Sequence, residues 1–346
     1  MRLFFFWWAF CMTLLYGCSP SGTTEVEIPL GDLKAGDWLL TLQLNDSVSL
    51  PINVEVNNAS EMVFINGEER IVAQLDFIAA DSLHIVMPFF ENAFHARVGE
   101  KGERLTGYWY NFTKDDYSIP FTATAGSQAR FCIDSKNTDL ADHYEVHFSP
   151  GSTDEYPAVG LFKQGPSGTV LGTFATETGD YRFLEGGVCG ETLSLSCFDG
   201  SHAFLFTAIL SGDSLVNGQF YSGSHWNEPW QAHVNLDFDL RDPYTLTEIV
   251  DSSALGQTRF ILEDGSFLSL DDLRKPGEVS IIQVMGSWCP NCMDESLFFK
   301  SLFNQYNSSG LSILPLAFES SDDPVKAYTA IHKLETDLEL PFPIYY

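Results

Sequence analysis

The pentapeptide Asp-Ser-Leu-His-Ile at residues 81–85 recurs in altered form as Glu-Thr-Leu-Ser-Leu at residues 191–195, an offset of 110 residues (191 − 81). Further matches lie at or near this offset: Ala93-Phe94 with Ala203-Phe204, and Leu105–Trp109 with Leu215–Phe220 after a one-residue insertion. The pentapeptides alternate apolar and polar residues, as half-buried strands do. The repeat indicates two copies of a unit of roughly 90 residues, each long enough for roughly six to eight strands.

The sequence around these matches is β-rich from about residue 36 to about residue 240. Short alternating or β-branched runs are separated by Gly, Asn, Asp and Pro, and no run has a convincing helical period. We therefore expect an all-β region with one repeat at residues 36–142 and a second at residues 143–247. A pair of sandwiches, a pair of barrels and one fused barrel all fit this pattern.

Polar residues within the β region give little sign of chemistry. We interpret the histidines as exposed or hydrogen-bonded strand residues because none has partners at metal-ligand spacing: His143, His147, His202, His225 and His233. Cys197 aligns with Met87 in the repeat, which predicts a small apolar core residue. Cys132 and Cys189 are candidate disulfide partners, but spacing alone cannot pair them.

Composition limits the classes of partner. The 346 residues include 47 Asp and Glu against 18 Lys and Arg, a formal charge of −29. Phosphate-binding surfaces need clustered cations, so nucleic acid and anionic membranes are disfavoured as partners. With 45% apolar and 14% aromatic residues, the chain can bury sizeable cores, and its length suggests two or three domains.

The N-terminus has the features of an export signal. Arg2 precedes an apolar run of about 14 residues at 3–16, shorter than the roughly 20 residues that span a bilayer. Gly17-Cys18 at its end resembles the bacterial lipobox, which implies a signal peptide at 1–17, acylation of Cys18 and a tether at 18–35. The alternative is an ordinary signal peptide with an incidental cysteine. Either places the chain in the cell envelope, extracytoplasmic on the periplasmic side, where disulfides persist.

After residue 243 the sequence pattern changes, and this C-terminal segment contains a candidate catalytic site. The apolar strand Val279–Met285 runs into Gly-Ser-Trp-Cys-Pro-Asn-Cys at 286–292, and an amphipathic helix is predicted over Pro290–Tyr306. Cys289 at this helix N-terminus is the expected nucleophile, since such positions lower a cysteine pKa from about 8.5 to roughly 3.5–7.5. Cys292 is expected to resolve the mixed disulfide. A structural zinc half-site and a structural disulfide are the alternatives.

This C-terminal segment resembles the TlpA/ResA-like thiol-disulfide oxidoreductases of the thioredoxin superfamily over residues 253–346. The resemblance is carried by the Asp264-Gly265 hairpin, the strand at 279–285, the motif at 288–292, Glu295 and the strand at 311–318. It implies an α/β thioredoxin-like domain in which Cys289 attacks, Cys292 resolves and Trp288 flanks the site. It also implies that Glu295 assists proton transfer.

Two departures from that family are visible. Gln283 occupies the position where cytoplasmic thioredoxins place a buried acid. After the helix expected at 323–337, the sequence stops at 341–346 without the cis-proline loop and the strand that would pair with 279–285. We therefore expect the thioredoxin-like domain to be C-terminally incomplete, with further residues in the natural product.

The sequence thus predicts a multidomain chain: a duplicated all-β region, sandwich or barrel, followed by the incomplete thioredoxin-like domain. The expected function is extracytoplasmic thiol-disulfide exchange, reducing protein disulfides through the Cys-Pro-Asn-Cys dithiol, with no cofactor and no metal. Its expected partners are protein disulfides, a membrane electron donor and the membrane through the lipid anchor, but not nucleic acid. The alternative is a ligand- or partner-binding β-rich lipoprotein with a vestigial redox domain.

Overall fold

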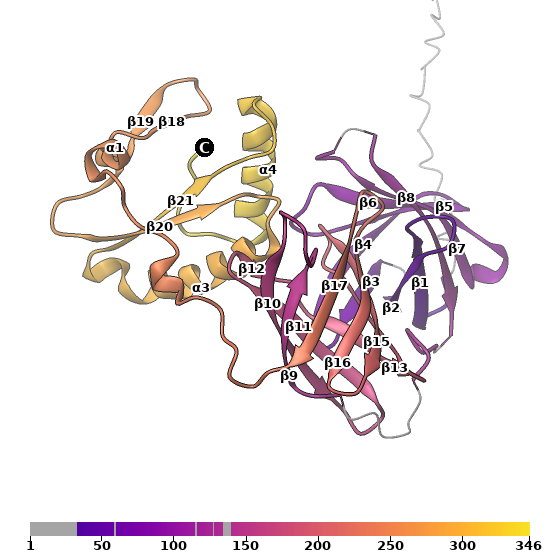
Figure 1. The fold of residues 1–346 in the computed structure, drawn as a ribbon. Coiled ribbons are helices and arrows are strands. Elements are labelled where there is room, and N and C mark those ends of the chain that lie inside the picture. Colours follow the sequence, from indigo (N-terminus) through magenta and orange to yellow (C-terminus); the bar gives the residue numbers. More distant parts are fainter. Residues whose placement is uncertain (1–32, 59, 115, 127, 134–139) are drawn as a thin grey trace, which may run out of the picture.

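The computed structural model describes residues 33–58, 60–114, 116–126, 128–133 and 140–346, so the predicted signal segment and Cys18 lie outside the described residues. Two β-barrels lie next to each other, and a smaller helical part packs beside them (Figure 1). No helix in these ranges has both the length and the apolar character needed to cross a bilayer.

The first barrel is an antiparallel meander of eight strands closed by pairing of the first strand with the last. Its strands are β1 (Gly36–Gln43), β2 (Ser49–Asn58), β3 (Glu61–Asn66), β4 (Glu69–Ala79), β5 (Ser82–Val86), β6 (Asn92–Val98), β7 (Arg104–Asn111) and β8 (Ser118–Ala125). In β1, Trp38, Leu40 and Leu42 are fully buried and alternate with more exposed residues. This period of two directs one set of side chains inward, as closure requires.

The second barrel repeats this plan. Its strands are β9 (His143–Phe148), β10 (Tyr156–Gln164), β11 (Thr169–Thr176), β13 (Leu184–Cys189), β14 (Thr192–Phe198), β15 (Ala203–Ser211), β16 (Ser214–Ser222) and β17 (Trp226–Val234). β17 pairs with β9 and thereby closes the ring, while the short β12 (Gly179–Asp180) adds to β11 outside it. The sequence repeat therefore matches β5 with β14, β6 with β15 and β7 with β16.

The two barrels share a core. Phe198 of β14 packs into the core of the first barrel, with its ring centroid 5.2 Å from that of Phe64. The buried Asn66 side chain donates to the Phe198 carbonyl and accepts from its N–H at 2.9 and 3.1 Å. The buried Arg130 guanidinium donates to the carbonyls of Ile65 and Ser196, one from each barrel. A disulfide joins Cys132 to Cys189 of β13, a pairing that the sequence left open. Cys197 is a buried core residue, as predicted, and its thiol is free.

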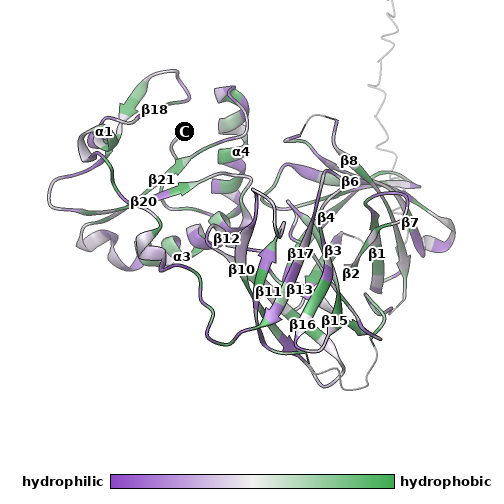
Figure 2. Ribbon diagram, viewed as in Figure 1, coloured by the Kyte–Doolittle hydropathy of each residue, from purple (hydrophilic) through white to green (hydrophobic). Residues whose placement is uncertain are grey.

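The C-terminal part is small and helical. It comprises α1 (Ser252–Gly256), β18 (Arg259–Ile261), β19 (Phe267–Ser269), α2 (Leu270–Leu273), β20 (Val279–Met285), α3 (Pro290–Tyr306), β21 (Leu311–Ala317) and α4 (Pro324–Asp337). β18 and β19 form a hairpin, and β20 and β21 form a parallel pair. Figure 2 colours β21 and parts of α4 green, the colour of hydrophobic residues. Phe90 of the first barrel completes a core with Met285, Met293 and residues of α4.

The predicted fold class is wrong. Most of the described chain forms two closed barrels, and the described residues contain four α-helices. The thioredoxin-like fold would place the strand Val279–Met285 between two neighbours, whereas β20 in the described residues pairs with β21 alone. The local elements expected here are confirmed, since α3 spans Pro290–Tyr306 and β20 spans Val279–Met285. A strand, a helix and a strand do not by themselves make the predicted domain.

Candidate functional site

The site residues predicted from the C-terminal motif cluster at the start of α3. Cys289 and Cys292 form a disulfide, and Cys289 caps the helix, with its Sγ accepting from the Cys292 N–H at 3.2 Å. The Trp288 indole is 43% exposed and donates to the Phe318 carbonyl at 3.0 Å. Glu295 accepts a hydrogen bond of 3.0 Å from Gln283 Nε2. The roles assigned to Trp288, Cys289, Cys292 and Glu295 stay predictions, as does acylation of Cys18.

This end of α3 is docked against the barrels. The Asn291 side-chain amide donates to the Asp180 carbonyl at 3.2 Å, and the Ser201 hydroxyl donates to the Trp288 carbonyl at 3.0 Å. Asp294, in the first turns of α3, pairs with Arg182 of the second barrel. The Cys289–Cys292 disulfide therefore lies where the C-terminal part contacts the second barrel.

The barrel interiors are filled with aromatic and aliphatic side chains. Those exposed by less than 2% include Trp38, Phe64, Phe94 and Trp109 in the first barrel, and Tyr144, Phe148, Phe174, Phe206 and Trp230 in the second. Eight-stranded barrels are just wide enough for side chains to fill them or to hold one small ligand. Because rings occupy both lumens, the candidate binding site is on the outer surface.

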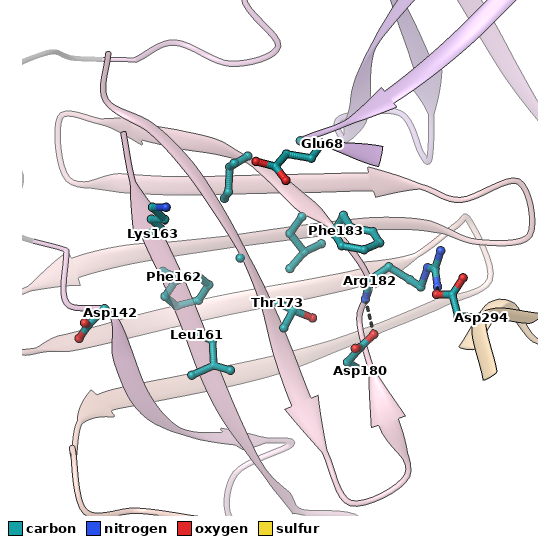
Figure 3. A pocket seen from close by; sticks show the side chains of 14 residues that line it. Glu68, Asp142, Leu161, Phe162, Lys163, Thr173, Asp180, Arg182, Phe183 and Asp294 are labelled. Carbon is teal, nitrogen blue, oxygen red and sulfur yellow. Dashed lines mark hydrogen bonds and ion pairs between the residues drawn. The ribbon is translucent and has the colours of Figure 1, made fainter. Parts of the chain in front are cut away.

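A groove of about 430 Å³ lies on the flank of the second barrel, and we call it the flank groove (Figure 3). Its apolar wall includes Leu161 of β10, Leu171 of β11 and Phe183, which follows β12. Leu161 and Phe183 are 42% and 49% exposed, so both present apolar surface to the solvent. The volume falls within the range of about 300–1,000 Å³ that is typical of small-molecule sites.

Two buried polar atoms in the flank groove have no hydrogen-bond partner. They are the hydroxyl oxygen of Thr173 and Nε of Arg182. Arg182 is only 6% exposed, and its other guanidinium nitrogens bond to Glu69 and Asp294. A buried polar group without a partner costs roughly 1–3 kcal/mol. Both atoms expose less than 1 Å², so a ligand acceptor recovers that free energy only if the side chains over them move as it binds. Figure 3 shows both side chains among the lining residues.

The charge around Arg182 is already compensated. Burial works against its positive charge, but the carboxylates of Glu69 and Asp294 outweigh that effect and raise the pKa of Arg182. Burial also raises the pKa of Glu69, although Arg182 at 2.5 Å opposes the shift. Asp142 and Glu68 add further carboxylates to the lining. The groove therefore offers hydrogen-bond donors without net positive charge, which suits a neutral ligand better than an anion.

Sequence reasoning missed Thr173, Arg182 and Phe183. They come from β11 and from the segment between β12 and β13, and their side chains meet only because the barrel closes. The sequence held one local signal, the dipeptide Arg182-Phe183. Basic residues are scarce in this chain, at 18 in total, so an arginine directly beside an aromatic residue stands out. In the described ranges, no three His, Cys, Asp or Glu side chains lie where they could share a metal ion.

Comparisons with known proteins add little. No protein-family profile and no curated protein matches this sequence. Solved structures that match include a DUF3598-family protein of unknown function from Nostoc punctiforme, at 12% identity and TM-score 0.20, covering 59% of this chain and 95% of that one. A candidate outer membrane protein from Bacteroides fragilis matches at 10% identity and TM-score 0.21, covering 59% and 96%. Likenesses this weak carry no argument about fold or function.

The predicted family and enzymatic activity are corrected by the fold. The chain is predominantly a two-barrel β protein, and the described C-terminal residues lack the sheet on which the resemblance to the TlpA/ResA-like proteins depends. The assignment as a thioredoxin-like oxidoreductase, with the redox-active centre and redox homeostasis that it implied, is therefore wrong. The expected disulfide substrates and membrane electron donor depended on that activity and stay untested predictions.

Proposed function

We propose that the protein is a binding protein of the cell envelope and that its flank groove holds a small neutral molecule. The ligand would have an apolar body and at least one hydrogen-bond acceptor such as a carbonyl oxygen. The observation that carries this proposal is the pair of unpartnered buried polar atoms, Thr173 Oγ1 and Arg182 Nε, beside the apolar wall of the groove. Specific sites commonly combine apolar walls with a few such polar groups.

The ligand is expected to bind in a fixed orientation. Its apolar body would lie on Leu161, Leu171 and Phe183, and its acceptor would take a hydrogen bond from the Arg182 Nε–H. The Arg182 guanidinium carbon lies 5.4 Å from the centre of the Phe183 ring, so the polar and apolar parts of the groove are adjacent. The contacts of Arg182 with Glu69 and Asp294 would keep this donor in place when the groove is empty.

A fluorescent probe with this chemistry tests the proposal. Prodan is neutral and joins a naphthalene ring to one carbonyl group. We expect its emission to shift to the blue and saturate as the purified chain is added. Phe183→Ala should weaken binding by at least about tenfold, because it removes ring contact. Thr173→Val should weaken it by a smaller factor.

Leu236→Ala is the matched control, since Leu236 is 70% exposed and does not line the groove. It should leave the Prodan titration unchanged. Equal binding by wild type and Phe183→Ala, both with native far-UV circular dichroism, would show that the groove is not the site.

The location is proposed from the sequence and from the cysteines. The apolar leader and Cys18 indicate export and a lipid anchor facing the periplasm. The Cys132–Cys189 disulfide supports an oxidising compartment, where such bonds persist. Phase separation in Triton X-114 tests the anchor: the wild-type chain should enter the detergent phase and Cys18→Ser should remain in the aqueous phase. Identical partitioning of the two would remove the anchor from the account.

A further inference from the structure

A second surface, separate from the flank groove, carries a cluster of exposed and half-buried rings. On the outer face of the first barrel, rings from three neighbouring strands lie side by side, and we call them the aromatic track: His84, His95, Tyr108, Tyr110 and Phe112. Alternation explains their direction, because their neighbours Leu83, Phe94 and Trp109 are buried inside the barrel.

The rings of the track are in mutual contact. His84 and His95 occupy directly opposed positions on β5 and β6, and their ring centroids lie 3.8 Å apart with an angle of 15° between planes. His95 lies 4.6 Å from Tyr110. Tyr110 and Phe112 are 6.2 Å apart and nearly parallel, at 3°. These two outward rings therefore lie in nearly parallel planes.

The aromatic track borders a surface pocket on the first barrel and ends at a cleft beside the C-terminal part. A hollow of about 550 Å³ lies over the first barrel beside His84, His95, Tyr108 and Tyr110. Phe112, at the end of the track, also lines a cleft of about 500 Å³ between the barrel and the C-terminal part. Trp288 lies on the wall of this cleft, so exposed aromatic residues continue across the joint.

The cleft supplies hydrogen-bonding groups beside its rings. Glu319, Asp322 and Lys326 line it together with several hydroxyl side chains. The Glu319 carboxylate accepts from the Ser287 N–H and hydroxyl at 2.8 and 2.7 Å, which leaves acceptor capacity for a ligand. Exposed aromatic rings next to hydrogen-bonding groups suit a ligand that has both apolar faces and many hydroxyl groups.

We propose that the aromatic track and the adjoining cleft bind a neutral oligosaccharide. A sugar ring presents C–H groups on its face, which carry partial positive charge and stack on the negative face of an aromatic ring. Its hydroxyl groups would bond to the polar residues of the cleft. The chain's charge of −29 disfavours an acidic polysaccharide or an anionic lipid surface. Burial and the neighbouring His84 lower the pKa of His95, so this ring serves as a neutral stacking surface near neutral pH.

Affinity electrophoresis of the purified chain tests this proposal. Native gels would contain glycogen, laminarin, xyloglucan or mannan, which are neutral and soluble. We expect retardation in at least one of the four gels. Phe112→Ala should weaken that retardation by about tenfold, and Phe112→Tyr should retain it because the ring is kept.

Tyr244→Ala is the matched control, since Tyr244 is 93% exposed and lies outside both hollows. It should migrate like the wild type in every gel. No retardation in any of the four gels would overturn the proposal. A loss of retardation in Tyr244→Ala equal to that in Phe112→Ala would also overturn it. Binding to phosphatidylcholine vesicles without retardation by any glycan would overturn it too, and would indicate a membrane-binding surface instead.

Discussion

Asp199 is a buried carboxylate next to the junction of the two barrels. It accepts hydrogen bonds from the N–H groups of Ser201 and His202 at 2.8 and 2.6 Å, and His202 Nδ1 lies 3.1 Å away. Burial alone would raise the pKa of Asp199. The charge and hydrogen bonds of His202, together with Arg182, outweigh burial and lower this pKa below its usual value.

This shift makes a prediction about stability and pH. Because the pKa is lower in the folded state, Asp199 contributes stability above its unfolded pKa of about 3.9 and loses it as the pH falls through the folded value. Asp199→Asn should therefore lower the free energy of unfolding by about 1–3 kcal/mol at about pH 6. The deficit relative to wild type should shrink at about pH 3. Urea titrations at both pH values measure it, and a deficit that grows on acidification would contradict the assignment.

For single residues, the sequence predicted burial where it follows from the alternation and the repeat of the strands. Cys197 was predicted as a core residue from its alignment with Met87, and it is fully buried. Arg182 could not be predicted, because its partners Glu69 and Asp294 are 113 and 112 residues away in the chain. Its backbone also adopts a positive φ of 63°, which no sequence pattern around it indicates.

Between elements, β14 links the two barrels. Its Phe198 packs among Phe64, Phe94 and Trp109 of the first barrel, at centroid distances of 5.2, 5.4 and 5.2 Å. A side chain from one barrel therefore fills the core of the other. This arrangement predicts that the barrels unfold together rather than in sequence.

Phe198→Ala tests that coupling. The cavity should lower the free energy of unfolding by about 3–5 kcal/mol, as for other buried aromatic truncations. Hydrogen exchange should show reduced protection in β3 of the first barrel as well as in β14. Phe183→Ala, at a half-exposed position, should change neither. Loss of protection confined to the second barrel would mean that each barrel folds by itself.

The sequence predicted individual strands and helices but not which strands pair over long distances. Alternation and the repeat predicted a duplicated β region, and the helix over Pro290–Tyr306 was predicted from its apolar spacing. Closure depends on the pairs β1–β8 and β9–β17, which join strands from opposite ends of each repeat, so the choice of barrel over sandwich was left open. Likewise, the motif at Cys289 predicts a strand followed by a capped helix, but it does not predict how many strands pair with that strand.

For the whole molecule, the barrels rather than the cysteine motif determine the functional proposal. Their lumens are filled with rings, so binding is assigned to outer surfaces: the flank groove and the aromatic track. Arg182 of the second barrel bonds to Glu69 of the first and to Asp294 of α3, and so ties all three parts together beside the groove. A ligand in the groove would therefore contact the residue that joins them.

The central claim is that the flank groove, and not a barrel lumen, is a ligand site. A crystal structure of the chain grown with Prodan tests it most directly. We predict difference density along Leu161, Leu171 and Phe183, with the probe carbonyl within hydrogen-bonding distance of Arg182 Nε. Density inside either barrel, or a groove without density at saturating Prodan, would contradict the account.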